Sequence, residues 1–162
     1  MKIALGSDHR GDIVTADLAT YLKGQGHETI VVGTCGGEAC DYPDDAYQVA
    51  KAVSENRADR GILACGSGIG MSIAANKVDG IRAALVFDDV SAGRSRRHND
   101  ANVLCVSPEM TTLDQIRQIV DTWLETDFEG GRHTRRVEKI RAIERGEDPA
   151  ELNIESADTT SA

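Results

Sequence analysis

The most informative segment of this chain reads Arg60-Gly61-Ile62-Leu63-Ala64-Cys65-Gly66-Ser67-Gly68-Ile69-Gly70-Met71. A short apolar run ends at a cysteine, glycine then occupies every second position, and a helix-like segment follows. Alternating glycines let a backbone adopt positive φ and bring its N–H groups close to a ligand. The helix that begins behind such a loop favours an anion at its N-terminus. The pattern therefore predicts a strand, an anion-binding loop and a helix, with Cys65 where a thiolate would be stabilised.

The same order of strand and helix recurs along the chain and predicts the fold class. Apolar runs predict strands at 2–6, 28–33, 60–64, 81–86 and 102–106. Segments of helical period predict helices at 12–25, 44–54, 69–77, 89–97 and 112–125, with a further helix at 132–145. Five strand–helix repeats indicate an α/β domain whose mostly parallel sheet is covered on both faces. With strand order 2-1-3-4-5, the loops that follow the first and third strands would meet where ligands bind in such sheets.

Length and charge limit the functions open to this chain. Its 162 residues correspond to one domain, predicted at 1–146, followed by a polar, acidic tail at 147–162. The net charge of -9 argues against nucleic acid as a partner, because phosphate backbones bind basic surfaces. No segment approaches the roughly 20 apolar residues that span a bilayer, and the first residues lack the apolar stretch of a signal peptide. We therefore expect a cytoplasmic protein with no membrane partner.

The four cysteines lack the paired C-x-x-C spacing of a zinc site, so no metal centre is predicted. Cys35 and Cys40 flank two glycines in a predicted loop and are at most a weak metal pair. In a reducing cytoplasm we expect no disulfide. Cys105 lies in an apolar run and is interpreted as a small core residue. Cys65 is either a buried structural thiol or a reactive thiolate, and its place before the glycine loop favours the second interpretation.

Further polar side chains are predicted to lie near Cys65. Ser67 is either a turn residue or a hydroxyl that binds a substrate oxygen. Asp8-His9 follows the first strand, where Asp8 would cap the next helix or the pair would move protons between substrate oxygens. Tyr42, after the second strand, would form a wall of the same site.

His98 closes the helix that follows the fourth strand, where the helix dipole favours an imidazole. Because helices run antiparallel to the strands, this position lies at the sheet edge away from Cys65. A catalytic His98 would therefore have to serve a second copy, which predicts an obligate dimer with shared sites. Arg132 and Arg136 are four residues apart on one helix face, where two guanidinium groups would clamp a phosphate.

The glycine loop also has an interpretation of another class. Gly66-x-Gly68-x-Gly70, with Asp88 after the next strand, is similar to a dinucleotide fingerprint. The last glycine of that fingerprint, however, would fall at Met71. No Lys-Ser or Lys-Thr pair follows the loop, so a P-loop is excluded.

Five motifs, taken together and in this order, resemble the type B ribose-5-phosphate isomerases, a family that includes galactose-6-phosphate isomerase subunits. The motifs are Gly6-Ser7-Asp8-His9; Asp41-Tyr42-Pro43; Cys65-Gly66-Ser67-Gly68-Ile69-Gly70 with Ala74-Ala75-Asn76-Lys77; Arg97-His98-Asn99-Asp100-Ala101-Asn102; and Gly130-Gly131-Arg132-His133 with Arg136-Val137. The resemblance runs from Met1 to about Glu144. It implies a Rossmann-like αβα sandwich, a homodimer or dimer of dimers, no metal or organic cofactor, and a sugar phosphate as substrate.

The resemblance also implies roles for the residues at matching positions. Cys65 would move a proton between C1 and C2 of ribose 5-phosphate and ribulose 5-phosphate through a cis-enediolate, and His98 would open the sugar ring. Met71 stands where one branch of the family has a glutamate, so the cysteine branch fits. The implied substrate contacts are Asp8, His9, Gly66, Ser67, Gly68, Ile69, Gly70, Asn99, Arg132 and Arg136.

One position departs from the family pattern. Glu109 stands after the fifth strand, where the family has a phosphate-binding arginine. The departure leaves the sugar open, and a tetrose, allose or galactose phosphate is an alternative to ribose 5-phosphate. Arg10, beside Asp8-His9, is a hypothetical replacement for the missing charge. A nucleotide-binding module and a non-catalytic sugar-phosphate sensor remain as alternatives to an isomerase.

Overall fold

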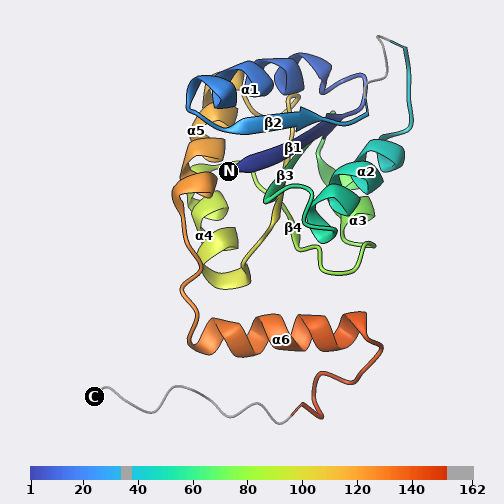
Figure 1. The fold of residues 1–162 in the computed structure, drawn as a ribbon, viewed down its shortest axis with the longest axis vertical. Coiled ribbons are helices and arrows are strands. Elements are labelled where there is room, and N and C mark those ends of the chain that lie inside the picture. Colours follow the sequence, from blue (N-terminus) through green and yellow to red (C-terminus); the bar gives the residue numbers. More distant parts are fainter. Residues whose placement is uncertain (34–37, 153–162) are drawn as a thin grey trace.

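The computed structural model describes residues 1–33 and 38–152, which fold into a three-layer α/β domain with a projecting helix (Figure 1). The strands are β1 (Lys2–Ser7), β2 (Glu28–Val31), β3 (Arg60–Ala64), β4 (Ala83–Leu85) and β5 (Val103–Val106). The helices are α1 (Asp12–Gly24), α2 (Tyr42–Ser54), α3 (Ile69–Ala75), α4 (Asp89–Asn99), α5 (Leu113–Glu125) and α6 (Arg132–Glu144). The predicted alternation of strands and helices, with one extra helix near the C-terminus, is confirmed.

The strands form one parallel sheet in the order β2-β1-β3-β5-β4. The predicted order 2-1-3-4-5 is therefore wrong at its last two positions. β5 is buried along its whole length and pairs with both β3 and β4, whereas β4 is only half-buried. An inner parallel strand has to be apolar on both faces, which favours β5 in the inner place. The predicted neighbourhood of β1 and β3 is confirmed, so the loops after these strands start side by side.

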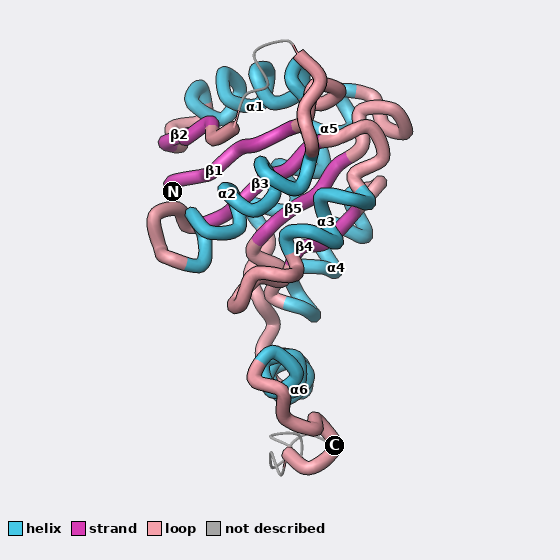
Figure 2. The backbone as a smooth tube through the Cα atoms, turned by 90° about the vertical axis from the view of Figure 1, so that its right-hand side faces the viewer, coloured by secondary structure: helices cyan, strands magenta, loops and turns pink. Residues whose placement is uncertain are grey.

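Helices cover both faces of the sheet (Figure 2), and a hydrophobic cluster on each face holds the layers together. Alternate residues of a strand point to opposite faces. Ile3 and Leu5 accordingly pack with α1 and α5, while Ala4 packs with α2 and α3. Trp123 of α5 is fully buried in the first cluster. Removal of such side chains from water, at about 25 cal/mol per Å² of apolar surface, is the main stabilising contribution to the fold.

Several element ends differ from the prediction for local reasons. α2 begins at Tyr42, before the predicted start, because Pro43 fits the first turn of a helix. α4 continues to Asn99 and ends where Asp100 adopts the left-handed conformation, with φ of 48°. Asp88 caps α4 by accepting a hydrogen bond from the N–H of Ser91 over 2.6 Å. This cap gives Asp88 a structural role and weakens the dinucleotide interpretation.

α6 lies apart from the three layers, across the end of the molecule where α4 finishes (Figures 1 and 2). The ring of His133 stacks on that of His98, and Gly80 N–H donates to Oε1 of Glu144 over 3.1 Å. Ile140 and Ile143 of α6 are exposed. Exposed apolar side chains on a projecting helix are typical of an arm that packs against another molecule.

Other predictions concern the cysteines and the chain end. Cys40 is disulfide-bonded, so the expectation of fully reduced cysteines is wrong at this residue. Cys35 and residues 153–162 of the predicted tail lie outside the described residues, and the domain boundary at 146 stays a prediction. Among residues 1–33 and 38–152, no helix combines the length and the hydrophobicity that a bilayer span requires.

Candidate active site

Cys65 lies directly after β3, at the sheet edge formed by the carboxyl ends of the strands, here called the carboxyl edge. Its side chain is only 5% exposed and belongs to the cluster on the α2 and α3 face. The N–H of Gly68 donates to Cys65 Sγ over 3.2 Å. Gly68 has φ of 73°, and a Cβ there would lie 2.5 Å from Leu85 Cδ1. The glycine therefore allows the loop to curl back over the sulfur, which is buried yet accepts a hydrogen bond.

Cys105 offers a comparison within the same core. It is fully buried on β5, and burial, followed by the proximity of Cys65, raises the pKa of its thiol far above the ordinary range. Among residues 1–33 and 38–152, no hydrogen bond reaches its sulfur, so the prediction of a core cysteine is confirmed. Cys65 differs from Cys105 in receiving a backbone N–H.

The loop between β1 and α1 rests on the end of β3. A Cβ on Gly11 would lie 2.4 Å from the carbonyl oxygen of Ala64, so only glycine permits this approach. Asp8 is buried, and its Oδ1 accepts hydrogen bonds from the N–H groups of Arg10 and Gly11 over 2.9 and 3.2 Å. Gly11 is the N-cap residue of α1, so Asp8 orders the preceding turn instead of capping the helix itself. His9, the next residue after Asp8, is exposed at the same edge.

The glycine loop is fixed by further contacts at the carboxyl edge. Ser107 Oγ donates to the carbonyl oxygen of Gly66 over 2.5 Å. Ser67 Oγ accepts from the N–H of Ile69 over 3.3 Å, which supports its interpretation as a turn residue. A Cβ on Gly70 would lie 2.5 Å from the ring of Tyr42, so this ring packs on the loop. The sequence therefore placed Tyr42 correctly at this edge.

Two acidic residues, Glu109 and Asp45, lie near this edge, and the sequence did not predict either of them as a site residue. Glu109 forms an ion pair with Arg10, so the proposed replacement charge is already paired within the chain. Asp45 is buried on α2, and burial, then the charges of Asp44, Asp12 and Asp8, raises the pKa of its carboxyl. The helical period that places Asp45 in register with buried apolar residues of α2 was the available signal for it.

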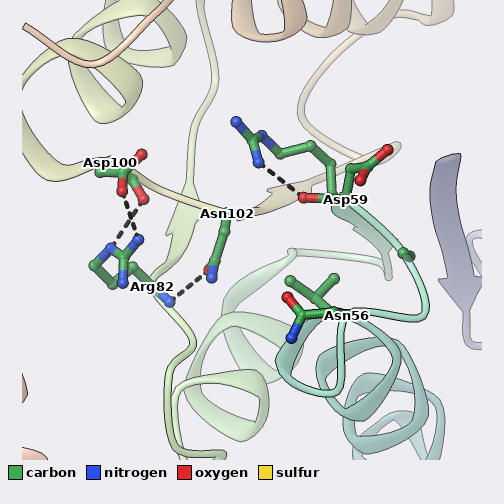
Figure 3. Close-up of a pocket in the computed structure, with 8 residues that line it drawn as sticks. Asn56, Asp59, Arg82, Asp100 and Asn102 are labelled. Carbon is green, nitrogen blue, oxygen red and sulfur yellow. Dashed lines mark hydrogen bonds and ion pairs between the residues drawn. The ribbon is translucent and has the colours of Figure 1, made fainter. Parts of the chain in front are cut away.

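The other candidates lie at the opposite edge, formed by the amino ends of β3 and β5 and here called the amino edge. α4 ends there with His98 and Asn99, just before β5. Asp100 is held by Arg82 Nη2 over 2.8 Å (Figure 3) and by Arg96 Nη1 over 2.9 Å, and we call these three residues the Asp100 clamp. A cavity of about 280 Å³ opens beside this clamp, and none of the predicted site residues lines it.

His98 belongs to a cluster with Glu129 and His133. The two imidazole rings stack with centroids 4.3 Å apart and planes inclined by 8°. Glu129 Oε2 lies 3.8 Å from His98 Nε2 and 3.7 Å from His133 Nε2. Burial lowers the pKa of His133, and the charges of His98, Arg132 and Arg136 act in the same direction.

The ligand atoms of the His98–Glu129–His133 cluster lie within 4.8 Å of one another, as in a metal site. A metal bond to imidazole lies in the ring plane and measures about 2.1 Å. Because the two rings are stacked in parallel planes, an ion in the plane of one ring lies outside the plane of the other. In this arrangement the two histidines cannot both ligate one ion.

Arg132 and Arg136 are exposed at the start of α6, beside His133. Within the described residues neither guanidinium takes part in an ion pair. The fold thus brings Asp8, His9 and Cys65 together at the carboxyl edge. His98, Asn99 and the two arginines gather separately at the amino edge, as the topology predicted for His98.

Comparison with known proteins agrees with this arrangement of motifs. Residues 3–140 match the family model described as Ribose/Galactose Isomerase. The chain is 49% identical over 143 residues to ribose-5-phosphate isomerase B of Escherichia coli K12, a match that covers 88% of this chain and 96% of the relative. It is 39% identical over 148 residues to D-erythrulose-4-phosphate isomerase of Pectobacterium atrosepticum, covering 91% and 97%.

A solved structure has the same fold. The ribose-5-phosphate isomerase B of Clostridium thermocellum superposes with a TM-score of 0.89 at 51% sequence identity. The superposition covers 90% of this chain and 99% of that one. The similarity therefore extends over both edges of the sheet and over most of the chain.

Proposed function

Since the chain belongs to the ribose/galactose isomerase family, we propose that it is an aldose–ketose isomerase that interconverts ribose 5-phosphate and ribulose 5-phosphate. The resemblance inferred from the five motifs is confirmed by the family match. The geometric observation that carries the proposal is the hydrogen bond from Gly68 N–H to Cys65 Sγ, 3.2 Å long. The N–H is aimed at the atom that would carry the negative charge when a thiolate removes a proton from carbon.

In the proposed reaction the Cys65 thiolate takes the proton from C2 of the open-chain aldose. The electron pair moves to the C1–C2 bond, and the carbonyl oxygen at C1 becomes the oxyanion of a cis-enediolate. N–H groups of residues 66–70 stabilise that charge, at about 3 kcal/mol for each well-placed donor. The thiol then returns a proton to C1, and the proton of the C2 hydroxyl moves to the oxyanion at C1, with Asp8 as the proposed carrier.

Ring opening is assigned to His98 of a second copy. Within one chain His98 lies at the amino edge, whereas Cys65 lies at the carboxyl edge. A site that uses both residues therefore needs two chains related by symmetry. The projecting α6 with its exposed Ile140 and Ile143 supports a homodimer or a dimer of dimers. Asn99, exposed beside His98, is proposed as a substrate contact in the same shared site.

The phosphate is assigned to Arg132 and Arg136 of the second copy. Both guanidinium groups are exposed, and they lie on one face of α6. Cations at a helix N-terminus are unfavourable unless an anion offsets them, which supports a phosphate ligand at this point. The site would need no metal or organic cofactor, and the reaction is proposed to take place in the cytoplasm.

A tetrose phosphate is the second candidate substrate, favoured by the similarity to an isomerase of D-erythrulose 4-phosphate and by Glu109. The test is an isomerisation assay with four-, five- and six-carbon sugar phosphates, read by exchange of the substrate C–H with solvent deuterium. We expect the highest kcat/KM with ribose 5-phosphate. Binding of sugar phosphates without turnover or exchange would instead identify a sensor, and binding of NAD or ATP a nucleotide module.

A further inference from the structure

An ion pair bridges two loops above the glycine loop at the carboxyl edge. Arg10 comes from the loop after β1, and Glu109 comes from the loop after β5. Nη1 of Arg10 donates a hydrogen bond to Oε1 of Glu109. A Cβ on Gly66 would lie 2.8 Å from Glu109 Oε1 and 3.0 Å from Arg10 Cδ. The pair therefore lies directly over the first glycine of the loop that follows Cys65.

The backbones at both ends of the pair are fixed, whereas the side chains are not. The N–H of Arg10 donates to Asp8 Oδ1 over 2.9 Å, and the N–H of Glu109 donates to the Gly66 carbonyl oxygen over 3.3 Å. The side chains of Arg10 and Glu109 are 60% and 49% exposed. Long, exposed side chains exchange partners readily, because solvent competes for the same hydrogen bonds. The guanidinium can therefore leave the carboxylate for a stronger anion without movement of either loop.

The charges of Arg10 and Glu109 have opposite effects on an anion that approaches Gly66. The hydrogen bond and the charge of Glu109 raise the pKa of Arg10, with a smaller contribution from the charge of Asp8. An anion that approaches Gly66 meets a guanidinium that is already paired and a carboxylate that repels it. A phosphate dianion is a stronger partner for a guanidinium than a single carboxylate, so it can displace Glu109 at a cost in affinity.

We propose that Glu109 is a specificity-determining residue, whose carboxylate competes with the phosphate of the substrate for the guanidinium of Arg10. This inference rests on the proposed function, since it concerns the same site and substrate. The competition lowers the affinity for phosphorylated sugars and leaves the chemical step at Cys65 unchanged. The Arg10–Glu109 pair thus determines how much the phosphate contributes to the affinity for the substrate.

The test uses Glu109→Gln, which keeps the shape of the side chain and removes its charge. We expect KM for ribose 5-phosphate, and the inhibition constant of inorganic phosphate, to fall about fivefold, the range of an exposed ion pair. kcat should stay within about twofold, since the proton transfer is not touched. Arg10→Gln should raise both constants, and adding Glu109→Gln to that variant should change them little, because Glu109 acts through Arg10.

Glu55→Gln is the matched control. Glu55 pairs with Lys51 and Arg57 at the C-terminus of α2, at the amino edge, with a similar exposure of 44%. The Glu55→Gln substitution removes the same charge from the chain and leaves the carboxyl edge unchanged, so KM should be unchanged. Equal effects of the two substitutions, or no effect of Glu109→Gln, would overturn the proposal.

Failure of the proposed function would give a different result. A wild-type protein without turnover of any sugar phosphate would contradict the isomerase assignment. Calorimetric titration of the same variants with inorganic phosphate would then still decide the role of Glu109. Tighter phosphate binding by Glu109→Gln would support the competition, and unchanged binding would refute it.

Discussion

The carboxyl edge and the amino edge of the sheet hold their functional side chains in different ways. At the carboxyl edge, backbone groups hold the site: Gly68 N–H bonds the sulfur of Cys65, and Asp8 bonds the turn that leads into α1. At the amino edge, side-chain charges hold the site, through the Asp100 clamp and through Glu129 beside His98. The first is a loop folded onto its own core, and the second is a surface that we propose serves a second copy of the chain.

The largest expected effect concerns Cys65. Cys65→Ala should lower kcat by about 10³-fold, because it removes the proposed base of the proton transfer. Exchange of the substrate C–H with solvent deuterium, followed by NMR, should disappear as well. Cys105→Ala is the control, since it alters the neighbouring buried thiol, and should retain exchange near the wild-type rate. Full exchange by Cys65→Ala would remove the carboxyl edge from the mechanism.

The second prediction tests the clamp at the amino edge. Asp100→Asn keeps a residue suited to the left-handed conformation and removes the charge that Arg82 and Arg96 share. Because the side chain of Arg96 is 4% exposed, its buried charge would lose its carboxylate partner and keep only the carbonyl oxygens of Ala101 and Thr126, at about 3 kcal/mol of unfolding free energy. Displacement of His98 and Asn99 should also lower kcat about tenfold.

The matched control for the clamp is Glu138→Gln, which breaks an exposed pair with Arg141 on α6. Its effect on the free energy of unfolding should stay below about 0.5 kcal/mol. Urea denaturation and steady-state kinetics measure both variants. A stable Asp100→Asn variant with wild-type kcat would show that the turn after α4 holds itself in place.

The smallest effect is a pH dependence at the amino edge. Burial lowers the pKa of His133, so the folded protein binds its proton less readily than the unfolded chain. The corresponding stability is present above the unfolded pKa of about 6.5 and is lost as the pH falls through the folded pKa. His133→Gln should therefore lose less unfolding free energy than the wild type between pH 7.5 and pH 5. Identical losses in urea denaturation at the two pH values would contradict a neutral, buried His133.

The sequence predicted the elements and the contents of both edges well, because period and motif order are local properties. The segment around Cys65 and the place of Tyr42 at the same edge follow from that local information. The position of His98 away from Cys65 follows from the antiparallel run of helices and strands. The strand order does not, since the inner place of β5 depends on burial across the whole sheet.

The ion pairs of the site could not be predicted from the sequence either. Arg10 and Glu109 are far apart in the chain, and so are Arg82 and Asp100. Spacing predicts a shared helix face but not a contact between two loops. The sequence also left open whether Cys65 is buried, because the curl of the loop over the sulfur depends on the conformation of Gly68.

The most direct test of the division between the two edges is a mixture of two inactive proteins, Cys65→Ala and His98→Gln, after subunit exchange. A mixed dimer holds one site with both residues intact and one site with neither. About a quarter of wild-type activity should return, because half of the dimers are mixed and each has one working site. A mixture that exchanges subunits, as native mass spectrometry would show, and stays inactive would contradict a site built from the carboxyl edge of one chain and the amino edge of another.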